Sequence, residues 1–290
     1  MGTVAFIGLG VMGAPMAGHL ASAGHDVRVY NRSVSKADRW AGEHHGTVAA
    51  SPAAAAAGAD AVFICVGNDD DVRHVVLAPD GVLAALEAGA TIVDHTTASA
   101  TLARELSTVA AASGVGFVDA PVSGGQAGAV NGTLTVMCGG DPAVFAEVAP
   151  LMSVYSRACT LLGPSGSGQL TKMVNQIAIA GLLQGLAEAL DFGMRAGLDI
   201  DTVIDVIGKG AAGSWQLDNR GPTMVRGEFD FGFAVQWMRK DLGICIDEAQ
   251  HNGAALAITK AIDGYYAEIV DMGGARWDTS SLIRRLGMSG

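Results

Sequence analysis

A lysine and an amide lie three residues apart at the start of a long apolar segment. At helical spacing, one face carries Lys172, Asn175, Ile179, Leu183, Leu186 and Leu190. An ammonium group can give a proton to a carbonyl oxygen, and a neutral amine can take one from a hydroxyl. An amide one helical turn away can bond the same oxygen. Lys172 and Asn175 therefore indicate a site at the point where this helix begins. The alternative is that Lys172 extends to solvent and Asn175 is a residue of the first helical turn.

A small-residue turn upstream has the composition of an anion site. Ser123, Gly124 and Gly125 follow a predicted strand, Val115–Asp119. Successive backbone N–H groups in such a turn form a concavity that holds a carboxylate or phosphate, and the Ser123 hydroxyl adds a further donor. These residues are candidate substrate contacts. A plain turn is the alternative, because Gly-Gly pairs are common there.

The N-terminal segment has a GxGxxG pattern between a strand and a helix. An apolar run, Thr3–Ile7, leads into a helix that we expect to end near Ala23, and a second strand follows at Asp26–Tyr30. The pattern residues are Gly8, Leu9, Gly10, Val11, Met12 and Gly13. The first glycine allows a tight turn, the second lets a pyrophosphate approach the backbone, and the third lets helix and strand pack closely. The helix N-terminus offers free N–H groups to phosphate. The sequence predicts a dinucleotide-binding βαβ unit.

The residues after the second strand bear on cofactor choice. An acidic side chain there would bond the ribose 2′-hydroxyl of NAD, but this chain has Asn31, Arg32 and Ser33. Arg32 can pair with a 2′-phosphate, and Asn31 or Ser33 can donate to it. We therefore predict that NADP(H) is preferred and that NAD(H) can also serve. The alternative is that Arg32 is a solvated surface charge.

Further strands are predicted at Ala59–Val66 and Thr91–Asp94. Ligands of open parallel sheets bind at the carboxyl ends of the strands, so Val66, Gly67 and Thr97 are candidate cofactor contacts. Thr97 could instead cap the following helix, as could Ser99. The fold class is α/β, with a Rossmann-type, doubly wound and largely parallel sheet.

The pattern of the sequence changes after Gly163. No further βαβ pattern appears, and residues 164–290 have the composition of helices broken at glycine-rich points. We predict a dinucleotide-binding domain over residues 1–163 and an all-α domain over 164–290, entered through one long helix and serving substrate binding and oligomerisation.

The composition restricts the classes of partner. A net charge of -11 argues against nucleic acid, which needs a basic face. Polar residues, among them Gln184 and Glu188, make a bilayer span costly, so no membrane is expected. The four cysteines show no metal spacing, and we expect buried free thiols of a cytoplasmic protein. No metal site is predicted.

The chain resembles the β-hydroxyacid dehydrogenases over its whole length. The motifs that carry the resemblance are GLGVMGAPMA from Gly8, DAPVSGG from Asp119, GSG from Gly166 with Lys172 and Asn175, and KDLG from Lys240. The resemblance implies that Lys172 is the catalytic acid–base and that Ser123, Gly124 and Asn175 hold the substrate. It also implies that Lys240 reaches the cofactor.

The family implies an oxidoreductase that transfers hydride between NADP(H) and a small 3-hydroxyacid or its semialdehyde, in a homodimer or homotetramer. Gln176, where many 3-hydroxyisobutyrate dehydrogenases have Asn, is more similar to tartronate semialdehyde reductases and leaves the exact small carboxylate substrate open. Two alternatives remain. One is a reductase of glyoxylate or succinic semialdehyde, and the other is a non-catalytic NADP-binding sensor.

Overall fold

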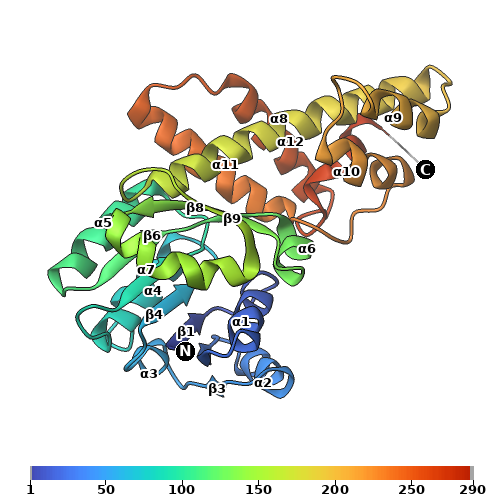
Figure 1. Ribbon diagram of the computed structural model, residues 1–290. Helices are drawn as coiled ribbons and strands as arrows, with labels where there is room; N and C mark the ends of the chain where they lie inside the picture. Colours follow the sequence, from blue (N-terminus) through green and yellow to red (C-terminus); the bar gives the residue numbers. More distant parts are fainter. Residues whose placement is uncertain (1, 288–290) are drawn as a thin grey trace. The chain divides into compact units, whose positions relative to one another are not determined.

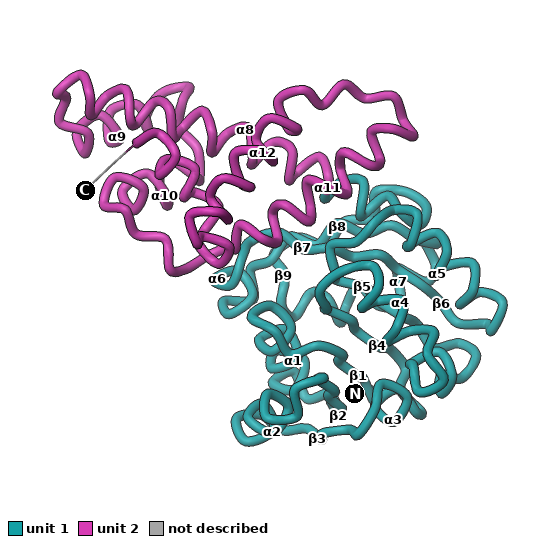
Figure 2. Tube along the Cα trace, turned by 180° about the vertical axis from the view of Figure 1, so that it is seen from behind, with its two compact units in different colours: residues 1–172 teal, residues 173–290 magenta. Residues whose placement is uncertain are grey.

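The structure is a computed structural model that describes residues 2–287 (Figure 1). The chain forms two compact units that divide between Lys172 and Met173 (Figure 2). This division falls inside the long helix α8 (Ser167–Arg195), whereas the expected domain boundary at residue 163 precedes it. The first turns of α8 are hydrogen-bonded to the first unit, as described below.

The first unit is built on a mostly parallel sheet. Its first six strands are β1 (Thr3–Ile7), β2 (Asp26–Tyr30), β3 (Thr47–Val48), β4 (Ala61–Ile64), β5 (Thr91–Asp94) and β6 (Gly116–Asp119). They pair in the order β3-β2-β1-β4-β5-β6, and every pair is parallel. This is the doubly wound order, whose switch point lies between β1 and β4, so the predicted fold class is confirmed.

Three later strands extend the sheet with a change of direction. They are β7 (Val122–Ser123), β8 (Leu134–Gly140) and β9 (Ser156–Leu161). Strand β8 is antiparallel to β6 and β7 and parallel to β9. The sheet is therefore parallel where the dinucleotide is expected and mixed at its far edge.

Helices cover both faces of this sheet. They are α1 (Gly13–Ser22), α2 (Val34–Glu43), α3 (Pro52–Ala56), α4 (Asp69–Leu77), α5 (Ala100–Ala112), α6 (Gly125–Val130) and α7 (Pro142–Met152), with short 3-10 turns at Val82–Ala84 and Ser153–Tyr155. Alternate residues of β1 enter different cores: Val4 and Phe6 pack on one face, and Ala5 and Ile7 on the other. A strand buried on both faces needs the continuous apolar run seen in the sequence.

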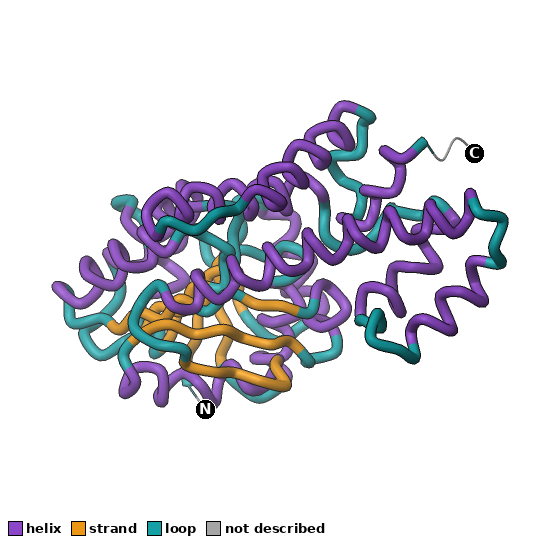
Figure 3. Tube along the Cα trace, turned by 90° about the horizontal axis from the view of Figure 1, so that it is seen from above, coloured by secondary structure: helices purple, strands orange, loops and turns teal. Residues whose placement is uncertain are grey.

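The second unit is helical, and no strand occurs among its described residues (Figure 3). After α8 come α9 (Ile200–Gly208), α10 (Trp215–Arg226), α11 (Val235–Asn252), α12 (Ala257–Asp271) and a 3-10 turn at Thr279–Leu286. Its core joins Leu183 and Leu190 of α8 to Leu242 of α11 and Tyr266 of α12. The apolar face predicted for the long helix is therefore used for packing within this unit.

Helix α8 is also long and apolar enough to cross a membrane, judged by length and composition alone. Its most apolar window has a mean hydropathy of 1.4, and 39% of that window is buried within the protein. The core helix of a soluble protein has the same properties, so this criterion does not separate the two.

Candidate functional site

The glycines of the first turn differ in the space around them. A Cβ at Gly8, where φ is 98°, would lie 2.2 Å from the carbonyl oxygen of Cys65, and one at Gly13 would lie 2.0 Å from the carbonyl oxygen of Gly8. A Cβ at Gly10 would meet nothing within 4 Å. Gly8 and Gly13 are thus required by close packing, whereas the space beside Gly10 is open. This pattern fits a loop that a pyrophosphate approaches at Gly10.

The loop is tied to the end of β2 by Asn31. The backbone N–H of Leu9 donates to Asn31 Oδ1 at 2.9 Å, and Asn31 Nδ2 donates to the carbonyl oxygen of Ser33 at 3.0 Å. The Asn31 side chain therefore stabilises the loop geometry. It retains one N–H for a ligand.

Arg32 is the exposed cation at this edge. Its side chain is 87% exposed, and its guanidinium lies 3.5 Å from the carboxylate of Asp71 in α4. A 2′-phosphate that binds Arg32 would meet this carboxylate as well. Arg32 would therefore attract the 2′-phosphate, and Asp71 would repel it.

The other candidate cofactor residues follow β4 and β5. Val66 donates its N–H to Thr96 Oγ1 at 3.0 Å, and Gly67 and Thr97 are half-buried. Ser99, not Thr97, caps α5, since its Oγ accepts from the Leu102 N–H at 3.0 Å. Because β1, β4 and β5 are neighbours, these residues and the Gly8 turn lie at the carboxyl ends of adjacent strands. The sheet brings them to one edge.

The Ser-Gly-Gly segment forms the start of α6. Gly124 has φ 132° and Gly125 has φ 61°, values that favour glycine. A Cβ at Gly125 would meet nothing within 4 Å, whereas Ser123 is paired with Thr135 in the sheet. The two glycines are exposed, so their backbone is accessible to a ligand.

Asp119 fixes the beginning of α8. Its carboxylate accepts from the Gly166 N–H at 2.7 Å and from the Gln169 N–H at 2.9 Å. Burial raises the pKa of this carboxyl, and the backbone donors oppose that rise. A Cβ at Gly168 would lie 2.4 Å from the carbonyl oxygen of Met137, so this approach requires glycine. Helix α8 is thereby attached to strands β6 and β8.

Gln169 makes a second attachment. Its Oε1 accepts from the Ala98 N–H at 3.0 Å, and its Nε2 donates to the Thr96 carbonyl at 2.7 Å. Lys172 follows one helical turn later and is 7% exposed. Sequence reasoning did not identify Asp119 or Gln169 as functional. The available signals were a glutamine inside an apolar helix and an aspartate that ends a buried strand.

Asn175, the next turn of α8, belongs to a chain of polar contacts in the second unit. Its Nδ2 donates to Gln176 Oε1 at 2.8 Å, and Gln176 Nε2 donates to Asp241 Oδ2 at 2.7 Å. Lys240 Nζ lies 3.0 Å from Asp241 Oδ1. Three of the predicted or motif residues are therefore connected: Asn175, Asp241 and Lys240.

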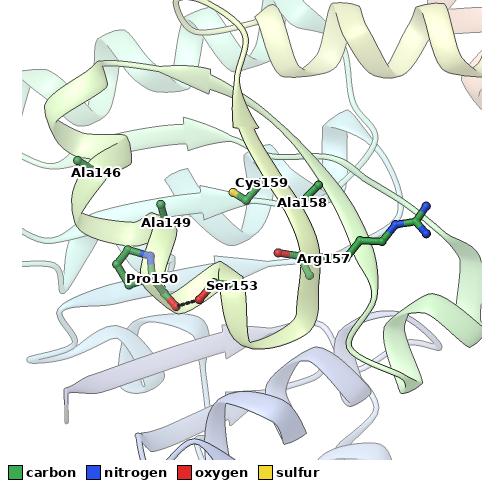
Figure 4. Close-up of a pocket in the computed structure, with 8 residues that line it drawn as sticks. Ala146, Ala149, Pro150, Ser153, Arg157, Ala158 and Cys159 are labelled. Atoms are coloured by element: carbon green, nitrogen blue, oxygen red, sulfur yellow. Dashed lines mark hydrogen bonds between the residues drawn. The ribbon is translucent and has the colours of Figure 1, made fainter.

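A surface pocket of about 420 Å³ lies elsewhere on the first unit (Figure 4). Its lining comes from α7, the 3-10 turn after it and the start of β9: Ala146, Ala149, Pro150, Ser153, Ser156, Arg157, Ala158 and Cys159. None of these is a predicted site residue. Among residues 2–287 no group of three or more His, Cys, Asp or Glu side chains could hold a metal ion.

Two family models match the chain. Residues 3–163 match the NAD binding domain of 6-phosphogluconate dehydrogenase, and residues 166–286 match the NAD-binding domain of NADP-dependent 3-hydroxyisobutyrate dehydrogenase. Together they span nearly all of the chain.

Curated relatives match over almost the full length. An uncharacterized oxidoreductase of Shewanella frigidimarina is 59% identical over 99% of this chain and 98% of its own. A probable 3-hydroxyisobutyrate dehydrogenase-like protein of Arabidopsis thaliana is 40% identical over 98% of this chain and 84% of its own.

A solved structure is similar to the chain over its whole length. The structure of Mycobacterium tuberculosis 3-hydroxyisobutyrate dehydrogenase with L-serine has a TM-score of 0.89 and 32% identity, covering 99% of each chain. These matches, together with the glycine turn and the doubly wound sheet, support pyridine nucleotide binding and NAD(P)-dependent hydroxyacid dehydrogenase activity. The chain belongs to the β-hydroxyacid dehydrogenase family.

Proposed function

We propose that this dehydrogenase prefers NADP(H), interconverts a small 3-hydroxyacid and its semialdehyde, and uses Lys172 as its general acid–base. The observation that carries the proposal is the attachment of Lys172. It is a nearly buried amine on a helix whose first turn is bonded to Asp119 and, through Gln169, to the segment after β5. General acid–base catalysis needs a proton-transferring group held at a fixed place.

When bound, the nicotinamide cofactor supplies or accepts the hydride. In the direction of reduction, the Lys172 ammonium donates a proton to the substrate oxygen as that oxygen becomes an alkoxide. In the direction of oxidation, the neutral amine accepts the hydroxyl proton. Asn175, one turn along the same helix, bonds the substrate oxygen and limits its movement.

The substrate carboxylate is assigned to the Ser-Gly-Gly segment. Its exposed backbone, the open space beside Gly125 and the Ser123 hydroxyl suit an anion. The M. tuberculosis relative was solved with L-serine, which has a carboxylate and a hydroxyl on the third carbon. The same two groups define the substrate class that we propose here.

The preference for NADP(H) is proposed from Arg32. No acidic side chain ends β2, and an exposed guanidinium stands there instead. The match of the second unit to a model named for an NADP-dependent enzyme supports the same cofactor.

A substrate panel tests the proposal. Initial rates are followed by nicotinamide absorbance with 3-hydroxyisobutyrate, L-serine, tartronate semialdehyde, glyoxylate and succinic semialdehyde, each with NADP(H) and NAD(H). We expect the highest kcat/KM with a 3-hydroxyacid or its semialdehyde and NADP(H). Preference for glyoxylate or succinic semialdehyde would assign the substrate to the alternative class. Cofactor binding with no turnover would favour the non-catalytic sensor.

Replacing Lys172 tests its role separately. Lys172→Ala should lower kcat by roughly 10²–10⁴-fold, the usual contribution of general acid–base catalysis. Binding of NADP+ should change little, because the glycine turn is unaltered. Lys209→Ala is the control, since Lys209 is an exposed lysine paired with Asp205 at 2.7 Å on the surface of α9. Near-normal kcat in Lys172→Ala would assign the proton transfer to another group.

A further inference from the structure

A line of hydrogen bonds, buried at Asp241 and half-buried at Asn175, determines which way the Asn175 amide faces. The line begins at Asp241, which is 2% exposed and whose carboxylate can only accept hydrogen bonds when ionised. Lys240 Nζ lies 3.0 Å from Oδ1 of this carboxylate. The other oxygen, Oδ2, is left for one donor.

Gln176 provides that donor and is thereby oriented. Its Nε2 lies 2.7 Å from Asp241 Oδ2, and the residue is 2% exposed. Reversing the amide would place its oxygen against the carboxylate, which costs a hydrogen bond in a buried place. The Gln176 oxygen must therefore face away from Asp241 and can only accept.

The same constraint reaches Asn175. Its Nδ2 donates to Gln176 Oε1 at 2.8 Å, so the Asn175 oxygen faces away from Gln176. An amide with a fixed carbonyl oxygen accepts a hydrogen bond from a hydroxyl or an ammonium group. An amide free to reverse would present its N–H groups part of the time.

We propose that Gln176 and Asp241 are positioning residues that hold the Asn175 carboxamide with its oxygen as the acceptor toward the substrate hydroxyl. This inference rests on the proposed function, since that function places Asn175 at the substrate. It also gives Gln176 a specific role: its side chain hydrogen-bonds both to Asn175 on α8 and to Asp241 on α11.

Two substitutions at Gln176 separate orientation from packing. Gln176→Leu keeps a similar volume but removes both bonds, so kcat/KM with 3-hydroxyisobutyrate and NADP+ should fall about 10- to 100-fold, as small misplacements at reacting centres do. The fall should lie mainly in kcat, and the Kd of NADP+ should stay within about twofold, because the glycine turn is intact. Gln184→Leu is the matched control, since Gln184 is a buried glutamine of the same helix whose Nε2 donates to Glu188 Oε1 at 2.7 Å.

Gln176→Glu gives a signature that packing alone would not produce. A protonated glutamic acid can donate its O–H to Asp241 and accept from Asn175, which restores the line. An ionised one faces a second carboxylate. The charged or titratable groups around this position are Asp241, Lys240 and Cys245 of α11 and Lys172 of α8. The ratio of variant to wild-type kcat should therefore fall as pH rises, whereas that ratio for Gln176→Leu should stay low at every pH.

A measurement that needs no catalytic turnover tests the inference without knowledge of the substrate. The side-chain amide signals of Asn175, observed by NMR in protein labelled with 15N-asparagine, should shift in Gln176→Leu and remain in place in Gln184→Leu. If wild-type protein oxidises no panel substrate, the proposed function fails, and these signals still test the line of bonds. Unchanged Asn175 signals, or a Gln176→Leu variant with wild-type kcat, would overturn the inference.

Discussion

Two arginines of the helical unit, Arg220 and Arg239, are already paired with carboxylates. Arg220 lies 3.2 Å from Asp278, which is 1% exposed, and its guanidinium also stacks over two aromatic rings. Arg239 pairs with Asp263 at 3.0 Å. A substrate carboxylate could use either arginine only by displacing its partner. This favours the backbone N–H groups of the Ser-Gly-Gly segment as the carboxylate site.

The carboxylate of Asp71 should limit the proposed preference for NADP(H). Asp71 lies 3.5 Å from Arg32, where its charge opposes a 2′-phosphate. Asp71→Asn should raise the ratio of kcat/KM with NADP+ to that with NAD+ by about 1.4- to fivefold, matching the ~0.2–1 kcal/mol typical of exposed ion pairs. Initial-rate kinetics with both cofactors measure the ratio.

Asp70→Asn is the control for this prediction. It removes the same charge from the same helical turn, but Asp70 pairs with Arg73 at 3.4 Å rather than with Arg32. The ratio should stay near the wild-type value. An equal rise in both variants would indicate a general effect of negative charge, not a specific pair with Arg32.

At the scale of elements, the sequence predicts what depends on local pattern. The apolar runs at Thr3–Ile7, Asp26–Tyr30 and Thr91–Asp94 are strands with these same bounds. The predicted strand Ala59–Val66 is shorter in the structure, at Ala61–Ile64, and the chain bends after it at Gly67 and Asn68. Helix α11 ends at a left-handed glycine, Gly253, with φ 78°, which the sequence pattern did not predict.

Contacts between distant segments are not visible in such patterns. The bonds from Asp119 to Gly166 and from Gln176 to Asp241 join residues 47 and 65 positions apart. In the sequence, each of these side chains could have several hydrogen-bond partners. The partner is known only once the packing of the helices and strands is known. The candidate residues were therefore predictable as types, while the groups that orient them required the structure.

Two of the four cysteines depart from the expectation of buried thiols, because Cys65 and Cys159 are half-buried. Cys159 of β9 lines the surface pocket (Figure 4) and lies beside Cys138 of β8, which is buried. Their sulfur atoms lie 3.6 Å apart, close enough for one thiol to donate to the other. Donation from Cys138 lowers the pKa of Cys159, and the pKa of Cys138 rises well above its ordinary value. Cys159 is therefore the more reactive of the two.

Alkylation rates test this difference. With limiting iodoacetamide near neutral pH, Cys159 should be modified before Cys138 and before Cys245, whose pKa burial raises to about 12. Peptide mass spectrometry measures the three rates. Cys138→Ala removes the donor and should slow modification of Cys159. Faster reaction at Cys245 or Cys138 would contradict the assignment.

At the scale of the whole molecule, two buried neighbours in the first unit respond to pH in opposite directions. Burial raises the pKa of Asp94 to about 7 and lowers the pKa of His95 to about 4. His95 Nδ1 lies 2.6 Å from the Ala120 carbonyl and Nε2 lies 2.9 Å from the Tyr155 hydroxyl. The neutral ring therefore donates through Nδ1 and accepts from Tyr155.

The signs of the two contributions follow from linkage. Between about pH 4 and 7 the folded state keeps a proton on Asp94 that the unfolded state releases, so this residue lowers stability as pH rises. Over about pH 4 to 6.5 the unfolded state holds a proton on His95 that the folded state lacks, so this residue raises stability as pH rises. Each effect is of order 3–4 kcal/mol at ~1.36 kcal/mol per pKa unit, and the two nearly cancel.

Replacing either Asp94 or His95 should therefore reveal the pH dependence of stability that the other residue contributes. In Asp94→Asn, which can still accept from the Thr96 N–H, the free energy of unfolding should increase between about pH 4.5 and 6.5, because the contribution of His95 is no longer opposed by that of Asp94. In His95→Gln it should decrease over the same interval, because only Asp94 remains. Urea unfolding at both pH values, followed by hydrogen exchange of the amides of β4 and β5, measures the change in the first unit. Parallel pH profiles in the two variants would show that these neighbours do not titrate in opposition, and a steep wild-type profile of either sign would assign the pH dependence to other groups.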